Sequence, residues 1–252
     1  MRDRNKSKIL ADWKKKEHLS SMFLTSVPFI VSSAEVVIDF LKFLHEPTPP
    51  DILNYATLAA YYWKHVIMKY GFNRGAALVT IVIDKQDFLP PIRQAIHNER
   101  KKKGKKASKQ PDLRIGDAIP ALHGTEHANA LQNPAYKKRL ITYLKEQFIK
   151  LACENKPKGT LILDCLQEMP LSVTNGHVQH ETVRSNTKGE ADNAIFTHVH
   201  KSPCKNILIV ASDTDITMYG LAALESMTTP NKNVVIEKNF KEEYIWFNYA
   251  LV

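Results

Sequence analysis

Apolar residues along the chain form two patterns, short continuous runs and longer stretches with helical spacing. The runs are rich in β-branched residues, which is typical of strands buried on both faces of a parallel sheet. They predict strands at residues 78–83, 160–164, 206–211 and 233–236. A shorter apolar segment, Phe29–Val31, predicts one further strand ahead of these.

Helical spacing of apolar positions predicts helices between the strands. The predicted helices cover residues 34–45, 51–70, 135–152 and 214–227, and two more begin at Pro90 and at Gly189 or Glu190. Local signals support their ends, because Asp51 and Asn133 are suitable N-caps and Gly71 is a suitable stop. Residues 104–133 show no clear period and predict a long loop.

Alternating strands and helices predict an α/β fold, with a mainly parallel twisted sheet flanked by helices on both faces. Asn175-Gly176, which separates two short β-like segments, predicts a hairpin turn. We expect residues 1–27 to form a basic N-terminal extension. Residues 28–252 are expected to form one domain, with a basic segment and loop at about 100–133.

Charge is distributed unevenly over the 252 residues. The net charge is +9, from 35 Lys and Arg against 26 Asp and Glu. Residues 1–16 carry +5 and residues 100–109 carry +7, together +12, so the rest of the chain carries −3. A mildly acidic body with two basic segments argues against a coating protein of the histone kind. It favours contact with polyanions at defined places.

Composition excludes several other classes of protein. Hydrophobic residues make up 44% of the chain, so wholesale disorder is not expected. Three cysteines without a C-x-x-C pair give no disulfide framework. The charged N-terminus does not fit a secretory signal, and no apolar run is long enough for a spanning helix. These features predict an intracellular protein, nuclear or cytoplasmic, without a membrane partner; they leave its oligomeric state open.

Acidic residues recur where the predicted strands end or helices begin. They are Asp84, Glu190, Asp192, Asp213 and Asp215. The carboxyl ends of parallel strands meet at one edge of a sheet, where ligands bind. Five carboxylates brought together there repel one another unless cations neutralise them, and Mg²⁺ suits such a set. Helix capping is the alternative explanation for any one of them.

The same residues lie in motifs that resemble the flap-endonuclease-like (XPG/PIN-like) 5′ nucleases. Val82-Ile-Asp84, Leu89-Pro-Pro-Ile-Arg93 and Arg100 with its trailing lysines resemble the family's strand, Pro-Pro turn and basic helix. Gly189-Glu-Ala-Asp192 and Ser212-Asp-Thr-Asp215 resemble its two later acidic motifs. The similarity spans about residues 28–225 and is closest to a divergent branch seen in mobile-element-like and viral genomes.

This resemblance implies a metal-dependent nuclease that hydrolyses DNA or RNA with two Mg²⁺ or Mn²⁺ ions. The implied metal ligands and catalytic residues are Asp84, Glu190, Asp192, Asp213 and Asp215. The implied nucleic-acid-binding residues are Arg93, Arg100, Lys101, Lys102 and Lys103. Arg93 and Arg100 are seven residues apart, so both lie on one face of a helix. The lysine cluster is also compatible with a solvated loop or a nuclear-localisation signal.

One departure from the family pattern favours a second function. The family's first strand ends in an Asp, whereas Phe29–Val31 is followed by Ser32 and Ser33. Either Glu35 or Asp39 substitutes further on, or the metal site is incomplete. The alternative is a catalytically degenerate nuclease fold that binds nucleic acid or a protein without cleaving.

Two histidine patterns offer weaker alternatives that involve zinc. His123-Gly-Thr-Glu126-His127 matches the inverted zinc-protease motif H-x-x-E-H. His198, His200 and Cys204 are spaced for a zinc cluster that lacks a fourth ligand. Packing or surface roles are the simpler explanation for these histidines. Asp164, which ends a predicted strand, is a spare candidate by position alone.

Overall fold

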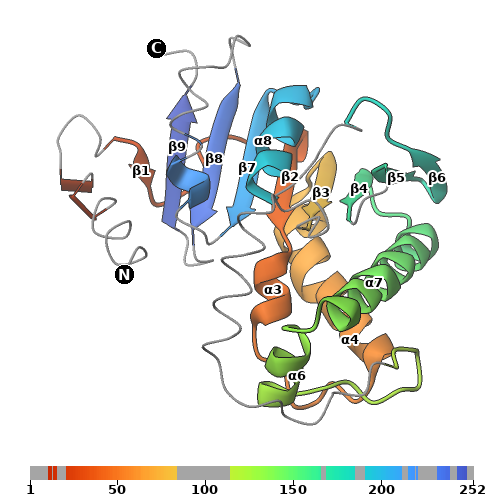
Figure 1. Cartoon of the computed structure of the whole chain (residues 1–252). Coiled ribbons are helices and arrows are strands. Elements are labelled where there is room, and N and C mark those ends of the chain that lie inside the picture. The colour runs from red at the N-terminus through yellow and green to blue at the C-terminus, as the bar shows by residue number, and fades with distance from the viewer. Residues whose placement is uncertain are drawn as a thin grey trace.

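The computed structural model has one nine-stranded sheet at its centre, with helices packed on both faces (Figure 1). The structure describes residues 11–12, 14–15, 21–83, 114–165, 169–184, 191–211, 215–218, 220, 232–238 and 243–248. Within these ranges no helix has the length and apolar character needed to cross a membrane.

Five parallel strands form the middle of the sheet. They are β2 (Ala34–Asp39), β3 (Leu78–Val82), β4 (Thr160–Asp164), β7 (Asn206–Ala211) and β8 (Asn233–Lys238). Their spatial order is β8-β7-β2-β3-β4. The chain therefore places β3 and β4 on one side of β2, and later β7 and β8 on its other side. Strands β3, β4, β7 and β8 confirm the four predicted apolar runs.

Antiparallel strands extend the sheet at both edges. They are β5 (Leu171–Thr174), β6 (His177–His180), β9 (Glu243–Asn248) and β1 (Phe23–Leu24). The β5–β6 hairpin confirms the Asn175-Gly176 turn, because both residues have the positive φ values, +52° and +83°, that such turns require. On the other edge β1 pairs with β9, so two residues of the predicted N-terminal extension belong to the sheet.

The structure corrects the prediction for residues 29–45. Val31–Ser33 is a short 3₁₀ turn (η1) rather than the end of a strand, and the predicted helix begins instead as β2. Only Leu41–His45 is helical (α3). All six residues of β2 are buried, and a strand buried on both faces needs no alternation of polar and apolar residues. The four-residue spacing of Glu35 and Asp39 looks helical, but an even spacing also places both on one face of a strand.

The next helix confirms the prediction apart from its start. Asn54, not Asp51, is the N-cap, because its side chain accepts from the Thr57 backbone N–H at 2.9 Å in a reciprocal capping box. Helix α4 (Tyr55–Tyr62) continues as the wider π-type helix η2 (Trp63–Gly71) and the short turn η3 (Phe72–Arg74). A Cβ on Gly71 would lie 2.5 Å from the Val79 side chain, so only glycine allows this close approach to β3.

In the described part of the connection between β3 and β4, residues 114–159, there are two helices. Helix α7 (Pro134–Asn155) confirms the prediction, and the Asn133 side chain caps it by accepting from the backbone N–H of Ala135 at 2.9 Å. Helix α6 (Gly124–Ala130) corrects the prediction of a continuous loop over 104–133. Its few apolar residues explain why no helical period is visible in the sequence. The helix predicted from Pro90 lies outside the described residues.

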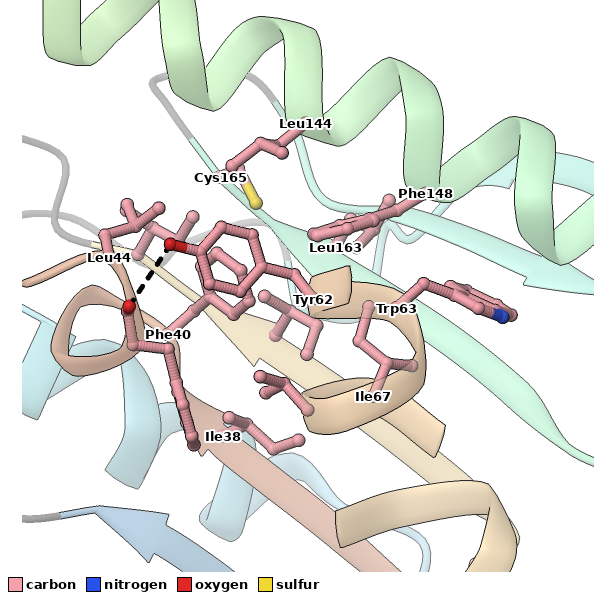
Figure 2. Close-up of a cluster of buried hydrophobic side chains, with 14 of the residues drawn as sticks. Ile38, Phe40, Leu44, Tyr62, Trp63, Ile67, Leu144, Phe148, Leu163 and Cys165 are labelled. Atoms are coloured by element: carbon pink, nitrogen blue, oxygen red, sulfur yellow. Dashed lines mark hydrogen bonds between the residues drawn. The ribbon is translucent and has the colours of Figure 1, made fainter. Parts of the chain in front are cut away.

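The two faces of the sheet have separate cores. On one face, Val36 and Ile38 of β2 pack with α4, η2 and α7 in an aromatic-rich cluster (Figure 2). Phe40 meets Phe148 edge-on there at 5.5 Å between ring centroids, and the Tyr62 hydroxyl donates to the Phe43 carbonyl at 3.3 Å. On the other face, Val37 packs with α8 (Ala191–Lys201) in a smaller cluster. The predicted α/β class is therefore correct.

Candidate functional site

The carboxyl edge of the sheet is the natural place for a site in this topology. The direction of strand order reverses between β2 and β7, which are direct neighbours. In open α/β sheets, ligands bind beside the carboxyl ends of the strands at such a reversal. The side chains that end β2 and follow β7 are therefore the first candidates.

Asp39 ends β2 at this edge. Its register partner on β3 is Val82, and both lie on the same face of the sheet as Val37 and α8. The residue is 9% exposed, and its Oδ1 accepts from the Leu41 backbone N–H at 3.2 Å. The expectation that Ser32 occupies the end of the first strand is thus wrong, because the first central strand begins at Ala34 and ends in an aspartate.

The sequence-predicted carboxylates are only partly covered by the structure. Asp192 lies in the first turn of α8, and Asp215 is a half-buried residue that begins the helical segment 215–218. Asp84, Glu190 and Asp213 lie outside the described residues. Asp84 nevertheless follows Ile83, whose backbone N–H donates to the Asp164 carbonyl. Asp213 follows Ala211, the last residue of β7, by two positions.

Among the described residues, no group of three or more His, Cys, Asp or Glu side chains is close enough to hold a metal ion. The described members of the predicted set are Asp192 and Asp215, and the structure adds Asp39 to them. Carboxylate oxygens are the donors that Mg²⁺ and Mn²⁺ accept. The donor chemistry of these residues therefore fits a hard divalent cation.

The predicted nucleic-acid-binding residues all lie outside the described ranges. They are Arg93, Arg100, Lys101, Lys102 and Lys103. The described part of the chain has a separate cationic surface on α7, beside a pocket of about 730 Å³. Arg114, Lys138 and Arg139 line this pocket together with Tyr143 and one acidic residue, Glu146. The Tyr143 hydroxyl donates to Asp117 at 2.8 Å, and burial, with this contact, raises the tyrosine pKa.

The H-x-x-E-H segment does not have zinc-site geometry. His123 precedes α6 as its N-cap, and within the helix Glu126 is exposed while His127 is buried. His127 Nε2 lies 2.9 Å from the Leu44 carbonyl, so this nitrogen donates to the end of α3. Burial is the main cause of the lowered His127 pKa. This histidine ties α6 to α3 and does not face Glu126.

The second zinc pattern is also separated by the fold. His198 is fully buried and its Nε2 lies 2.9 Å from Asp164 Oδ2, whereas His200 on the same helix is exposed. Asp164 therefore serves an internal contact. It faces the α8 side of the sheet, two strands away from Asp39 and level with it.

Asp39 is the candidate that sequence reasoning left undecided, although the chain contains a signal for it. Val36-Val37-Ile38-Asp39 repeats the pattern of Ile81-Val82-Ile83-Asp84, a β-branched run closed by an aspartate. The first run ends β2, and the second begins in β3, its parallel neighbour. Read as a strand, Val36–Asp39 predicts the first-strand aspartate that the family pattern requires.

Comparison with known proteins finds no family model that matches the chain and no matching curated protein.

Proposed function

We propose that this chain is a metal-dependent nuclease with a PIN-like (5′-nuclease-like) fold, which hydrolyses phosphodiester bonds in DNA or RNA. Two Mg²⁺ or Mn²⁺ ions would be held by the sequence-predicted carboxylates together with Asp39. Those predicted carboxylates are Asp84, Glu190, Asp192, Asp213 and Asp215.

The observation that carries this proposal is Asp39 at the carboxyl end of β2. This strand lies beside the reversal of strand order, with β3 on one side and β7 on the other. Asp84 follows β3 by two residues, and Asp213 follows β7 by two residues. In the sequence, each of these three neighbouring parallel strands therefore ends in an aspartate or is followed by one two positions later. We expect these aspartates to meet at one edge of the sheet, because the carboxyl ends of parallel strands lie there. An acidic edge of this kind is costly without cations and supports the metal assignment.

The proposed division of roles follows from the chemistry of the side chains. Bound divalent ions supply Lewis-acid stabilisation of charge on the phosphate and lower the pKa of a bound water. The carboxylates would hold and orient such ions, and the buried setting of Asp39 limits competing water. Arg93 and Arg100 are proposed to contact the substrate phosphates, as the family resemblance implies, with Lys101, Lys102 and Lys103 continuing this cationic stretch.

Replacing Asp39 by Asn tests the proposal directly. The Asn oxygen can still accept from the Leu41 N–H, so the turn after β2 keeps its hydrogen bond while the negative charge is lost. We expect cleavage of labelled single-stranded and flapped DNA and RNA in Mg²⁺ or Mn²⁺, and none in EDTA. Asp39→Asn and Asp213→Asn should each lower the rate about 100-fold or more, because several kcal/mol of charge stabilisation are removed.

Glu154→Gln is the matched control, since it neutralises an exposed carboxylate at the far end of α7. Its activity should stay at the wild-type level, and all variants should keep the wild-type melting temperature. Salt-sensitive nucleic-acid binding without cleavage in either metal would instead indicate the degenerate, binding-only function. The sequence favours that alternative through its lack of an aspartate after Val31, and the position of Asp39 at the end of β2 supports the nuclease proposal instead.

A further inference from the structure

A chain of buried polar groups lies between α8 and the sheet. The Arg184 guanidinium donates to both oxygens of Glu35 on β2, from Nη1 at 2.5 Å and from Nη2 at 3.1 Å. Thr80 Oγ1 on β3 also donates to Glu35, at 2.6 Å. Glu35 and Thr80 are fully buried and Arg184 is 3% exposed. This network therefore lies in the protein interior, where charge-assisted hydrogen bonds have strict geometry.

His198 connects the network to α8 and β4. Arg184 Nη1 lies 3.4 Å from His198 Nδ1, and an arginine can only donate, so this imidazole nitrogen accepts. The proton then resides on Nε2, which donates to Asp164 Oδ2 at 2.9 Å. The contacts thus run from β2 through Arg184 to the last turn of α8 and on to the end of β4.

These contacts fix α8 along its own axis. Asp192 precedes His198 by six residues, which is about 9 Å along a helix, so anchoring His198 determines where Asp192 lies. Lys232 strengthens the anchor at this same end of α8, because its ammonium donates to the carbonyls of Val199, His200 and Ser202 at 2.7, 3.1 and 2.7 Å. Arg184 lies seven residues before α8 and holds the incoming chain.

Stability alone does not explain these charges. Buried ion pairs can often be replaced by apolar side chains of similar volume without loss of stability. Apolar packing is non-directional, however, and the side chains that α8 contributes to its core are all apolar: Ala191, Ala194, Ile195, Phe196 and Val199. The directional hydrogen bonds of His198 to Arg184 and Asp164 select one axial position of the helix, which apolar contacts alone do not.

We propose that Arg184 is a positioning residue, which through Glu35 and the His198–Asp164 pair sets where Asp192 lies at the carboxyl edge of the sheet. This inference rests on the proposed metal-dependent function. Arg184 does not contact substrate or metal; it acts through the helix that carries the carboxylate.

The test is a pair of double variants in the full-length chain. Glu35→Leu/Arg184→Met replaces the network's ion pair by apolar side chains, which avoids leaving one charge buried alone. Glu237→Leu/Arg74→Met is the matched control, because Arg74 and Glu237 form a similar forked pair on the opposite face of the sheet. Mn²⁺ affinity is measured by calorimetry without nucleic acid, Mg²⁺ half-saturation by cleavage, and folding by the melting temperature.

We expect both double variants to have melting temperatures close to that of the wild type. Only Glu35→Leu/Arg184→Met should bind Mn²⁺ more weakly, by about tenfold or more. Losses of this size occur when groups that orient metal ligands are removed. The Mg²⁺ half-saturation of this double variant should rise by a similar factor. If that double variant does not fold, Arg184→Lys replaces it in the test. The lysine ammonium keeps the positive charge but cannot reach both Glu35 oxygens and His198. It should weaken Mn²⁺ binding by a few-fold at an unchanged melting temperature.

Other outcomes separate this inference from the proposed function. A wild-type protein that neither binds Mn²⁺ nor cleaves nucleic acid overturns the proposed function, and the inference with it. A wild type that binds Mn²⁺ while folded Arg184 variants match it overturns only the inference. Equal weakening in both double variants also overturns it, because the effect would then follow from loss of any buried pair.

Discussion

The two faces of the central sheet are built in different ways. One face is covered by α3, α4, η2 and α7 and buries a large cluster rich in aromatic rings (Figure 2). The other is covered by α8 and buries a smaller apolar cluster beside charged groups of the strands and of Arg184 (Figure 1). Alternation along β2 separates the two sets, since Val36 and Ile38 face the aromatic side whereas Glu35 and Asp39 face α8.

This difference indicates a division of tasks between the faces. Burial of apolar surface contributes most of the free energy of folding and does not depend on direction. Buried charges contribute little net stability, but their hydrogen bonds fix relative positions. We therefore infer that the aromatic face mainly stabilises the domain, while the α8 face mainly fixes the geometry at the carboxyl edge.

The strongest test of the aromatic face is Phe148→Ala. Phe148 is 1% exposed and packs edge-on against Phe40, so truncation leaves a cavity between α7 and the sheet. The free energy of unfolding should fall by about 4 kcal/mol, measured by urea denaturation at constant m-value. Lys150→Ala, on the exposed side of α7, should change it by less than about 0.5 kcal/mol. A loss below about 1 kcal/mol for Phe148→Ala would contradict the stabilising role of this face.

Removing one partner of the Arg184–Glu35 ion pair on the α8 face should lower the free energy of unfolding slightly less than Phe148→Ala does. Arg184→Met leaves Glu35 charged and buried without its partner, and we expect unfolding to become easier by about 3 kcal/mol. Arg74→Met should cost clearly less, because the Arg74 side chain is 27% exposed and water can reach the vacated space. Equal losses in the two variants would show that the faces do not differ in how they hold charge.

The sequence predicts much of the fold because local patterns there agree with the tertiary structure. Strands β3, β4 and β7 contain continuous runs rich in apolar and β-branched residues, and Asn133 and Gly71 mark the ends of their helices as expected. Residues 34–39 mislead because a strand buried on both faces carries Glu35 and Asp39 inside. Glu35 is paired with Arg184, which is 149 residues away from it in the sequence. No local pattern contains that information.

The candidate site shows the same limit. Its acidic residues are visible as strand-end and helix-start motifs, but the part played by Asp39 depends on which strand lies beside β7. The buried network of Arg184, Glu35, His198 and Asp164 has no local sequence signal either. Arg184 follows the β5–β6 hairpin, a position usually exposed, yet it is buried and contacts residues of β2, β3 and α8. Long-range partners, not local propensity, decide both assignments.

A smaller effect should follow from removing the cap of α7, the helix that covers the aromatic face. The Asn133 side chain accepts from the backbone N–H of Ala135 and of Tyr136. Asn133→Ala should lower the free energy of unfolding by about 1 kcal/mol, well below the effect of Phe148→Ala, because packing rather than capping holds α7 in place. Gln132→Ala is the exposed neighbouring control. A cap effect as large as the Phe148→Ala effect would show that packing is not what holds α7.

His127 provides a final test through the pH dependence of stability on the aromatic side. Burial holds the His127 pKa below its ordinary value of 6.5, with His123 adding to the effect and the Leu44 contact opposing it. Below pH 6.5 the unfolded chain therefore binds a proton that the folded chain excludes. Stability contributed by this residue is complete above about pH 6.5 and is lost as pH falls from there towards the lowered pKa.

His127→Gln should remove this contribution, because the Gln amide can donate to the Leu44 carbonyl but does not titrate. Urea midpoints at pH 7.5 and 5.5 should therefore differ less in His127→Gln than in the wild type. His177→Gln, on the exposed strand β6, should retain the wild-type difference. The remaining dependence in His127→Gln is expected to include His45, whose pKa burial and Lys137 also lower. If the difference between the two urea midpoints is the same in His127→Gln as in the wild type, protonation of His127 does not lower the free energy of unfolding. The contact between α6 and α3 would then not contribute to the stability of the aromatic face.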